Sequence, residues 1–191
     1  MSKYALWLIA VALAVTAGPA RTATAAYVIE PTATVVSFEV RNLGFARQRG
    51  EFDAVTGKVA LDSQARTGSV DIIVNARSVR TGNAATGEFL RGRSFLDVER
   101  FSQIVYRGSR VIFEQGKPLR IEGELTLLGV TRAVSLVVSN FECRTGAAGA
   151  SRCVLEAAAG FKRSQFGMNR YMTLVSDDVR LAIRGVTIED L

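Results

Sequence analysis

Residues 119–127 have the sequence Leu119-Arg120-Ile121-Glu122-Gly123-Glu124-Leu125-Thr126-Leu127, in which every second position is apolar or glycine. Successive side chains of a β-strand point to opposite faces of the sheet. A period of two therefore places the apolar residues on one face and the polar residues on the other. The stretch predicts a strand with one buried and one solvated face.

The same period of two recurs in seven other segments, so the sequence predicts eight strands. The other seven span about 34–41, 55–61, 70–76, 104–113, 132–141, 155–161 and 179–183. The apolar phase shifts across Gly108, which indicates a β-bulge or a sharp bend where the barrel wall turns. Strands with one apolar face pack as two sheets or close on themselves. Because closure leaves no exposed edge, we predict an all-β fold with an eight-stranded antiparallel barrel.

Residues 83–93 lack this alternation. They contain Ala84, Ala85, Glu88 and Leu90, which are good helix formers. We expect a short helix or an ordered loop here, covering one mouth of the barrel.

The N-terminus has the pattern of a secretory signal peptide. Lys3 precedes an apolar run over residues 4–17, and small residues follow at 22–26. The run is shorter than the roughly 20 residues of a membrane-spanning helix, which favours a cleaved leader over a membrane anchor. We predict a signal peptide over residues 1–25 and one mature domain over residues 26–191.

The two cysteines, Cys143 and Cys153, flank a glycine- and alanine-rich loop. Export permits a disulfide, which we predict between them; the alternative is two reduced thiols. The formal net charge is +6, but the arginines are interrupted by acidic residues. A nucleic-acid surface would present a dense basic stripe, so we expect no nucleic-acid partner.

The chain contains no histidine, which excludes catalysis by Ser-His-Asp or Cys-His groups and the commonest zinc and haem ligands. No phosphate-binding loop is present. Asp177 and Asp178 are adjacent, but no further oxygen ligands follow at calcium-loop spacing. We therefore predict that the protein is not an enzyme and that it holds no metal and no cofactor.

Several motifs in combination resemble the YceI-like family. They are residues 27–31 (Tyr-Val-Ile-Glu-Pro), 36–44 (Val-Ser-Phe-Glu-Val-Arg-Asn-Leu-Gly), 49–52 (Arg-Gly-Glu-Phe), 123–131 (Gly-Glu-Leu-Thr-Leu-Leu-Gly-Val-Thr) and 163–168 (Arg-Ser-Gln-Phe-Gly-Met). The resemblance covers nearly all of the predicted mature chain. It implies a lipocalin-like barrel exported to the periplasm, whose lumen binds a polyisoprenoid, an isoprenoid quinone or a similar apolar lipid. It also allows transient contact with a membrane surface or with membrane redox proteins.

This chain departs from the family pattern at two places. Asn42 stands where the family often has histidine, and Gly87-Glu88-Phe89-Leu90-Arg91 replaces a more polar stretch. Hydrogen bonds that relatives make to a ligand head group are therefore not expected to transfer unchanged.

An eight-stranded barrel is either filled by side chains or open to one slender ligand. Small residues that we expect to point inward, such as Gly57, Gly123 and Ala157, favour an open lumen. The alternatives are a filled barrel that serves as a structural or interaction module, and an enzyme acting on a lipophilic substrate. The candidate ligand-binding residues are Phe38, Asn42, Phe45, Phe52, Phe89, Leu90, Phe95, Phe101, Tyr106, Phe166 and Met168.

Overall fold

The computed structural model describes residues 25–43, 45–62, 64–146 and 149–190. The strands in these ranges are β1 (Ala25–Ile29), β2 (Val35–Asn42), β3 (Ala46–Phe52), β4 (Val55–Asp62), β5 (Thr67–Asn75), β6 (Val79–Thr81), β7 (Gln103–Glu114), β8 (Lys117–Leu127), β9 (Val130–Thr145), β10 (Ser151–Lys162) and β11 (Asp178–Glu189). The helical elements are α1 (Ala84–Arg91) and the 3-10 helices η1 (Pro31–Ala33), η2 (Ala76–Ser78) and η3 (Arg163–Phe166). The predicted signal peptide lies outside the described residues, except for Ala25, which begins β1.

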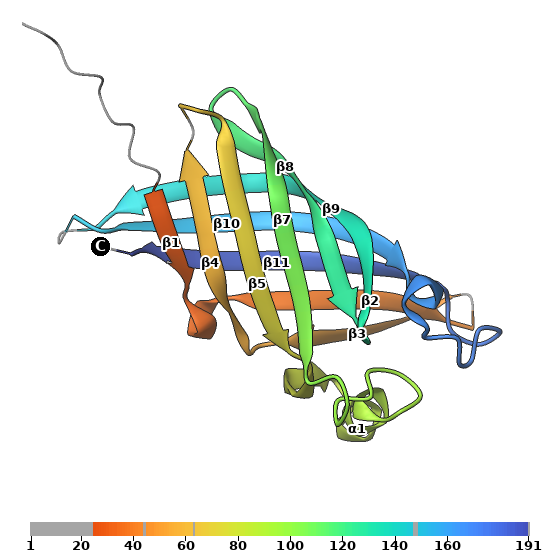
Figure 1. The fold of residues 1–191 in the computed structure, drawn as a ribbon. Coiled ribbons are helices and arrows are strands. Elements are labelled where there is room, and N and C mark those ends of the chain that lie inside the picture. Colours follow the sequence, from red (N-terminus) through yellow and green to blue (C-terminus); the bar gives the residue numbers. More distant parts are fainter. Residues whose placement is uncertain (1–24, 44, 63, 147–148, 191) are drawn as a thin grey trace, which may run out of the picture.

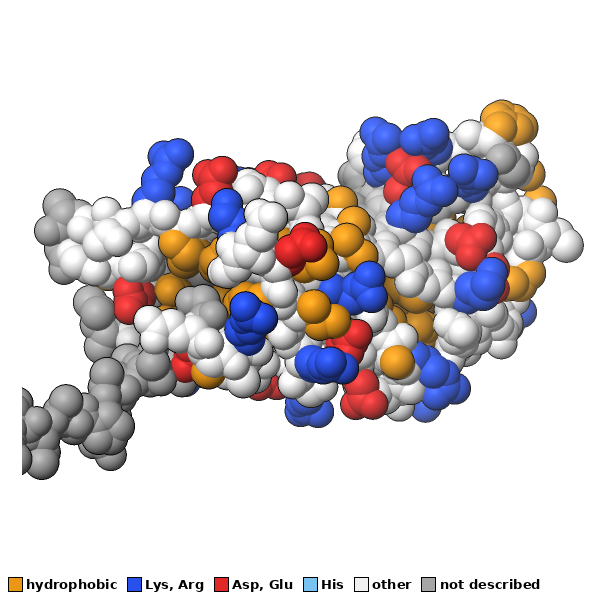
Figure 2. Space-filling view, turned by 90° about the horizontal axis from the view of Figure 1, so that it is seen from above, with side chains coloured by type: hydrophobic (Ala, Val, Ile, Leu, Met, Phe, Trp, Pro, Cys, Tyr) orange, Lys and Arg blue, Asp and Glu red, His pale blue; other side chains and the backbone are white. Residues whose placement is uncertain are grey.

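Eight of these strands form a closed antiparallel ring (Figure 1). The order around the ring is β1, β4, β5, β7, β8, β9, β10 and β11, and β11 pairs again with β1. The predicted eight-stranded antiparallel barrel is thus confirmed. One member differs from the prediction, because β1 completes the ring, whereas β2 branches away from it. Basic and acidic side chains are interspersed over the face that Figure 2 shows.

The branch arises where β11 changes partner. Its C-terminal end pairs with β1, and its residues 180–184 pair with β2, from which β3 and β6 extend the sheet. Val186 lies at the break between the two partners. Its carbonyl accepts from the Glu30 N–H at 2.8 Å. The buried Thr34 hydroxyl accepts from the Val186 N–H at 2.9 Å and donates to its carbonyl at 3.2 Å. Thr34 and Glu30 therefore satisfy backbone groups that a continuous strand would otherwise have paired.

The predicted bulge at Gly108 is present. The register between β7 and β8 shifts between Gly108 and Arg110. A Cβ at Gly108 would lie 2.6 Å from Cγ2 of Ile121, so the close approach of the two strands requires glycine there.

The predicted short helix is α1, which lies at one end of the barrel (Figure 1). Asn83 caps it by accepting from the Thr86 N–H at 3.2 Å. Arg91 fixes its last turn to the preceding chain, because its Nε donates to the Arg77 carbonyl at 3.0 Å and its Nη2 to the Val79 carbonyl at 2.7 Å.

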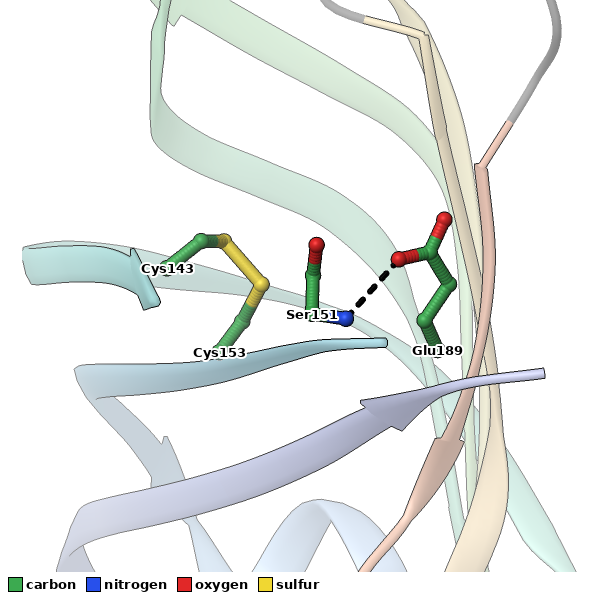
Figure 3. Close-up of a disulfide and its surroundings, with 4 residues drawn as sticks. All are labelled: Cys143, Ser151, Cys153 and Glu189. Carbon is green, nitrogen blue, oxygen red and sulfur yellow. Dashed lines mark hydrogen bonds between the residues drawn. A yellow bond between two sulfur atoms is a disulfide. The ribbon is translucent and has the colours of Figure 1, made fainter. Parts of the chain in front are cut away.

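The predicted disulfide joins Cys143, near the C-terminal end of β9, to Cys153, near the N-terminal end of β10 (Figure 3). The two residues are directly opposite in the β9–β10 register. Beside the bridge, the Ser151 N–H donates to the Glu189 carboxylate at 2.9 Å (Figure 3). The disulfide therefore fixes a strand pair that also contacts the end of β11.

Candidate ligand-binding cavity

The barrel encloses a cavity of about 180 Å³. Side chains of β2, β3, β5, β7, β8, β9, β10, β11, α1 and the adjoining loops line it, and the surface that it exposes is entirely apolar. A dry cavity of roughly 150 Å³ holds an aromatic ring. This barrel is therefore not completely filled by its own side chains.

Two aromatic residues form the wall where β2 and β3 pair. The ring centroids of Phe38 and Phe52 are 5.7 Å apart, and both side chains line the cavity. Phe38 lies opposite Gly50 in the strand register, and a Cβ at Gly50 would meet its ring. Gly50 thus lets the Phe38 ring lie flat across β3.

Tyr106 on β7 presents only its ring to the cavity. Its hydroxyl lies within 3.1 Å of both the Ile121 and the Val134 carbonyl oxygens, and it can donate its one proton to either of them. Burial raises the pKa of Tyr106 to about 12. Gly123 makes room for the hydroxyl, since a Cβ there would lie 2.8 Å from the Tyr106 oxygen and would also collide with the β7 backbone. Gly123 therefore serves the packing of Tyr106 and does not widen the lumen.

Gly57 does not widen the lumen either. Its φ of +152° and the collision of a Cβ with the Asp71 carbonyl show that glycine is required there by the close approach of β4 and β5. The expectation that Gly57 and Gly123 leave space for a ligand is wrong, because the missing side chain of each is required by the close approach of the adjacent strand's backbone.

Arg163 is the buried polar residue at the edge of the cavity, with 2% of its surface exposed. Its guanidinium donates to the carbonyls of Ser176 (2.9 Å), Val175 (2.9 Å), Met168 (2.7 Å) and Arg170 (2.8 Å). Four carbonyls of one loop thus converge on one planar donor, which fixes the loop over residues 168–176 against the barrel.

The charge of Arg163 is balanced locally. Burial lowers the pKa of Arg163, and the nearby Asp177 carboxylate opposes that shift. Partial burial alone would raise the pKa of Asp177, but hydrogen bonds from the Ser164 N–H and hydroxyl, both 2.8 Å, and the charges of Lys162 and Arg163 bring it below its usual value. The loop that carries Met168 is therefore an ordered part of the cavity wall.

Aromatic side chains surround the end of the cavity near α1. Leu90 and Phe95 line the cavity there. The Phe95 ring stacks on Tyr171 at 6.0 Å between centroids, and Phe89 contacts both rings at 5.2 and 5.7 Å. These contacts join α1 to the loop held by Arg163 and continue the apolar wall towards the outer surface.

The structure brings six of the eleven sequence-predicted candidates to the cavity and places five elsewhere. The six lining residues are Phe38, Phe52, Leu90, Phe95, Tyr106 and Met168. Phe166 is buried behind the wall, with its ring 5.1 Å from that of the lining residue Phe161. Phe101 lies against Gly129 and under the Arg100 guanidinium.

The other three candidates surround the mouth without lining the cavity. Phe45 is 81% exposed in the turn between β2 and β3. Phe89 is half exposed over Phe95 and Tyr171. Asn42 forms an isolated bridge with Val175, and its buried Oδ1 has no hydrogen-bond partner among the described residues.

Sequence reasoning missed the aliphatic part of the wall. The cavity is also lined by residues such as Val36, Ile72, Val134, Leu136, Leu181 and Ile183. The period of two places most of these aliphatic residues on the inward face of their strands, and this was the one sequence feature that could have identified them. Periodicity does not distinguish a side chain that faces a cavity from one that faces another side chain.

Comparison with known proteins gives consistent results. The YceI-like domain model matches residues 27–187. The UPF0312 protein of Yersinia pestis (strain Pestoides F) is 29% identical over 192 residues, which cover 99% of this chain and 100% of that protein. Among solved structures, Burkholderia cenocepacia BcnA superposes with a TM-score of 0.68 at 19% identity, over 83% of this chain and 98% of BcnA.

A second solved structure has the same fold. It is described as a polyisoprenoid binding domain from Saccharophagus degradans and superposes with a TM-score of 0.62 at 13% identity, over 86% of this chain and 98% of that domain. The barrel, its strand order and the match over residues 27–187 agree: the chain belongs to the YceI-like domain family.

Proposed function

We propose that this protein binds an elongated apolar lipid in the barrel cavity and carries it in the periplasm without chemical change. The ligand class is a polyisoprenoid or an isoprenoid quinone. The observation that carries the proposal is the cavity of about 180 Å³ whose exposed wall is entirely apolar. The Saccharophagus degradans domain, described as polyisoprenoid binding, supports the choice of ligand class.

The energetics of such a site require no polar anchor. Each buried methylene is worth about 0.8 kcal/mol, so a prenyl chain gains affinity with every unit that enters. The polar side chains that line the cavity already have partners, since the Tyr106 hydroxyl and the Arg163 guanidinium bond to backbone carbonyls. The cavity therefore favours a hydrocarbon tail over a polar molecule, and a longer lipid would extend its remainder through the mouth near α1.

Two features support the periplasmic part of the proposal. The disulfide between Cys143 and Cys153 is the kind of bond that persists in an oxidising compartment. The predicted leader over residues 1–25 would deliver the chain there.

The proposal is tested by filling the cavity. Val36 and Ile183 face each other across the β2–β11 pair, and both line the cavity. The double variant Val36→Phe with Ile183→Phe should weaken binding of an octaprenyl quinone at least tenfold, because the added rings occupy the space of the prenyl tail. Delipidated mature protein is incubated with the quinone and desalted, and the retained quinone is extracted and quantified.

The matched control is Val137→Phe, which adds a ring to an exposed position on the outer face of β9. It should retain the quinone like the unmodified protein. Equal retention by the filled and the control variants would contradict the proposal. Absence of retention by the unmodified protein would instead favour an interaction module.

A further inference from the structure

One end of the barrel carries a group of exposed large apolar side chains, which we call the mouth rim. It consists of Leu43, Phe45, Phe89, Tyr171, Met172 and Leu174. Phe45 and Leu43 are the most exposed, at 81% and 60%. The other exposed large apolar residues of the described chain lie on strands of the barrel wall: Val28, Ile73, Leu119, Val137 and Ile188. Exposed apolar groups that gather in one place usually mark a binding surface.

Three chain segments that are far apart in sequence meet at the mouth rim. The Leu43 N–H donates to the Leu174 carbonyl at 2.7 Å, which joins the β2–β3 turn to the loop held by Arg163. Phe89 on α1 contacts Tyr171 of the same loop at 5.7 Å. In Figure 1 the β2–β3 turn and this loop project together from one end of the barrel.

The mouth rim is continuous with the cavity. Tyr171 stacks on Phe95, and Phe95 lines the cavity. Val175, which follows Leu174 directly, also lines it. An apolar path therefore leads from the exposed rim into the lumen, so a molecule that covers the rim is in contact with the entrance.

Basic residues exceed acidic residues around the mouth rim. Glu39 is bonded to both Arg49 (2.9 Å) and Arg47 (3.5 Å), and it also lies opposite Arg180 in the β2–β11 register. Arg41 near the end of β2 and Arg170 in the loop held by Arg163 add exposed positive charge beside the rim. Figure 2 shows a group of Lys and Arg side chains beside a protruding hydrophobic tip at this end, which lies at the right. Exposed apolar side chains flanked by arginines are suited to a bilayer surface, because the apolar side chains can insert among acyl chains while the arginines contact anionic head groups.

We propose that the mouth rim docks on an anionic lipid bilayer. Phe45, Met172 and Leu174 enter the outer acyl region, and the arginines contact the head groups. This inference rests on the proposed function, because a protein that carries a membrane lipid has to accept it from a bilayer. Docking by the rim would bring the entrance of the cavity to the bilayer and spare the lipid a passage through water.

The experiment measures co-sedimentation of the mature protein with vesicles of phosphatidylethanolamine and phosphatidylglycerol (3:1) and with vesicles of phosphatidylcholine alone. We expect binding to the anionic vesicles that weakens as salt is raised, because salt screens the contribution of the arginines. Phe45→Ser with Leu174→Ser should weaken binding about tenfold or more. Arg41→Gln with Arg170→Gln should lower binding to the anionic vesicles only.

The matched control is Ile73→Ser with Val137→Ser, which removes two exposed apolar residues from the barrel wall. It should bind vesicles like the unmodified protein. Equal losses in the control and rim variants would overturn the proposal, as would unchanged binding by the rim variant. A two-chain mass in light scattering that reverts to one chain in the rim variant would also overturn it, in favour of a second copy as occupant.

Quinone retention from detergent solution, measured on the same variants, separates this inference from the proposed function. Retention without vesicle binding by the unmodified protein would remove the docking proposal and leave the carrier function intact. Vesicle binding through the rim without retention would support docking and remove the carrier function.

Discussion

Tyr106 contributes both to the cavity wall and to the stability of the fold. Its ring lines the lumen, and its hydroxyl lies within hydrogen-bond reach of the carbonyls of Ile121 on β8 and Val134 on β9. Tyr106→Phe keeps the ring but removes the side-chain donor that the described residues offer to these carbonyls. We expect a loss of about 1 to 2 kcal/mol in the free energy of unfolding at pH 7, measured by urea denaturation.

The same variant gives a pH test. Burial disfavours the phenolate and raises the pKa of Tyr106 from its ordinary value of 10.0 to about 12 in the fold. The neutral form is therefore favoured by folding, and its contribution is complete below pH 10 and lost as pH rises through 12. Between these values the unmodified protein should lose up to about 3 kcal/mol more than Tyr106→Phe does. Parallel pH profiles for the two proteins would contradict the assigned burial.

Arg163 holds in place the loop over residues 168–176, which forms part of the cavity wall. Lysine at this position keeps the charge, but its compact ammonium cannot reach four converging carbonyls. Arg163→Lys should lower the free energy of unfolding by about 3 kcal/mol, and it should weaken quinone retention because Met168 loses its support. The control is Arg180→Lys, an exposed position on β11 that should change stability by less than about 0.5 kcal/mol. Similar losses in urea for both variants would show that the network has no special role.

The sequence predicted an apolar lumen better than it predicted which residues line the cavity. The preference for aromatic residues found Phe38, Phe52 and Tyr106, which alternate with polar neighbours on strands. The same preference also selected Phe45 and Phe101, which do not line the cavity, because an aromatic residue outside a strand has no periodic context that reveals its direction. Arg163 belongs to the motif at residues 163–168 but is not among the candidate ligand-binding residues. Its role as a loop anchor depends on carbonyls up to 13 residues away, which no local pattern displays.

At the scale of elements, the strands with long alternating patterns could be predicted and the short or irregular ones could not. Segments such as 119–127 and 132–141 correspond to β8 and β9. β3 reads Ala-Arg-Gln-Arg-Gly-Glu-Phe, in which polar residues and Gly50 obscure the inward face. β1 and β6 have five and three residues, too few to establish a period. The closing strand of the ring was missed for this reason, although closure itself followed from the need to cover sheet edges.

The β9–β10 pair supplies a prediction at this scale. Cys143→Ser with Cys153→Ser should lower the free energy of unfolding by roughly 2 to 3 kcal/mol, because the bridge restricts the unfolded chain across a separation of 10 residues. Neither cysteine is among the residues that line the cavity, so quinone retention should stay unchanged. Reduction of the unmodified protein should reproduce the loss seen in urea. A variant that unfolds like the unmodified protein but loses its quinone would contradict both expectations.

For the whole molecule, the two ends of the barrel have different roles. The disulfide and the Ser151–Glu189 contact tie the strand ends near the β1–β11 closure. The opposite end carries α1, the loop fixed by Arg163 and the branched strands β2 and β3, and there the cavity wall reaches the surface. The branch at Thr34 connects the two, because β11 pairs with β1 on one side of it and with β2 on the other.

The most direct test of the lipid-carrier account is the mass of the protein as it leaves the cell. Mature protein purified from a bacterial periplasm without detergent is examined by native mass spectrometry, and the bound material is then extracted with solvent. We predict a species heavier than the mature chain by the mass of one lipid, which disappears on extraction and is absent from Val36→Phe with Ile183→Phe. A single species at the mass of the bare chain, together with no retention of added octaprenyl quinone, would contradict the account.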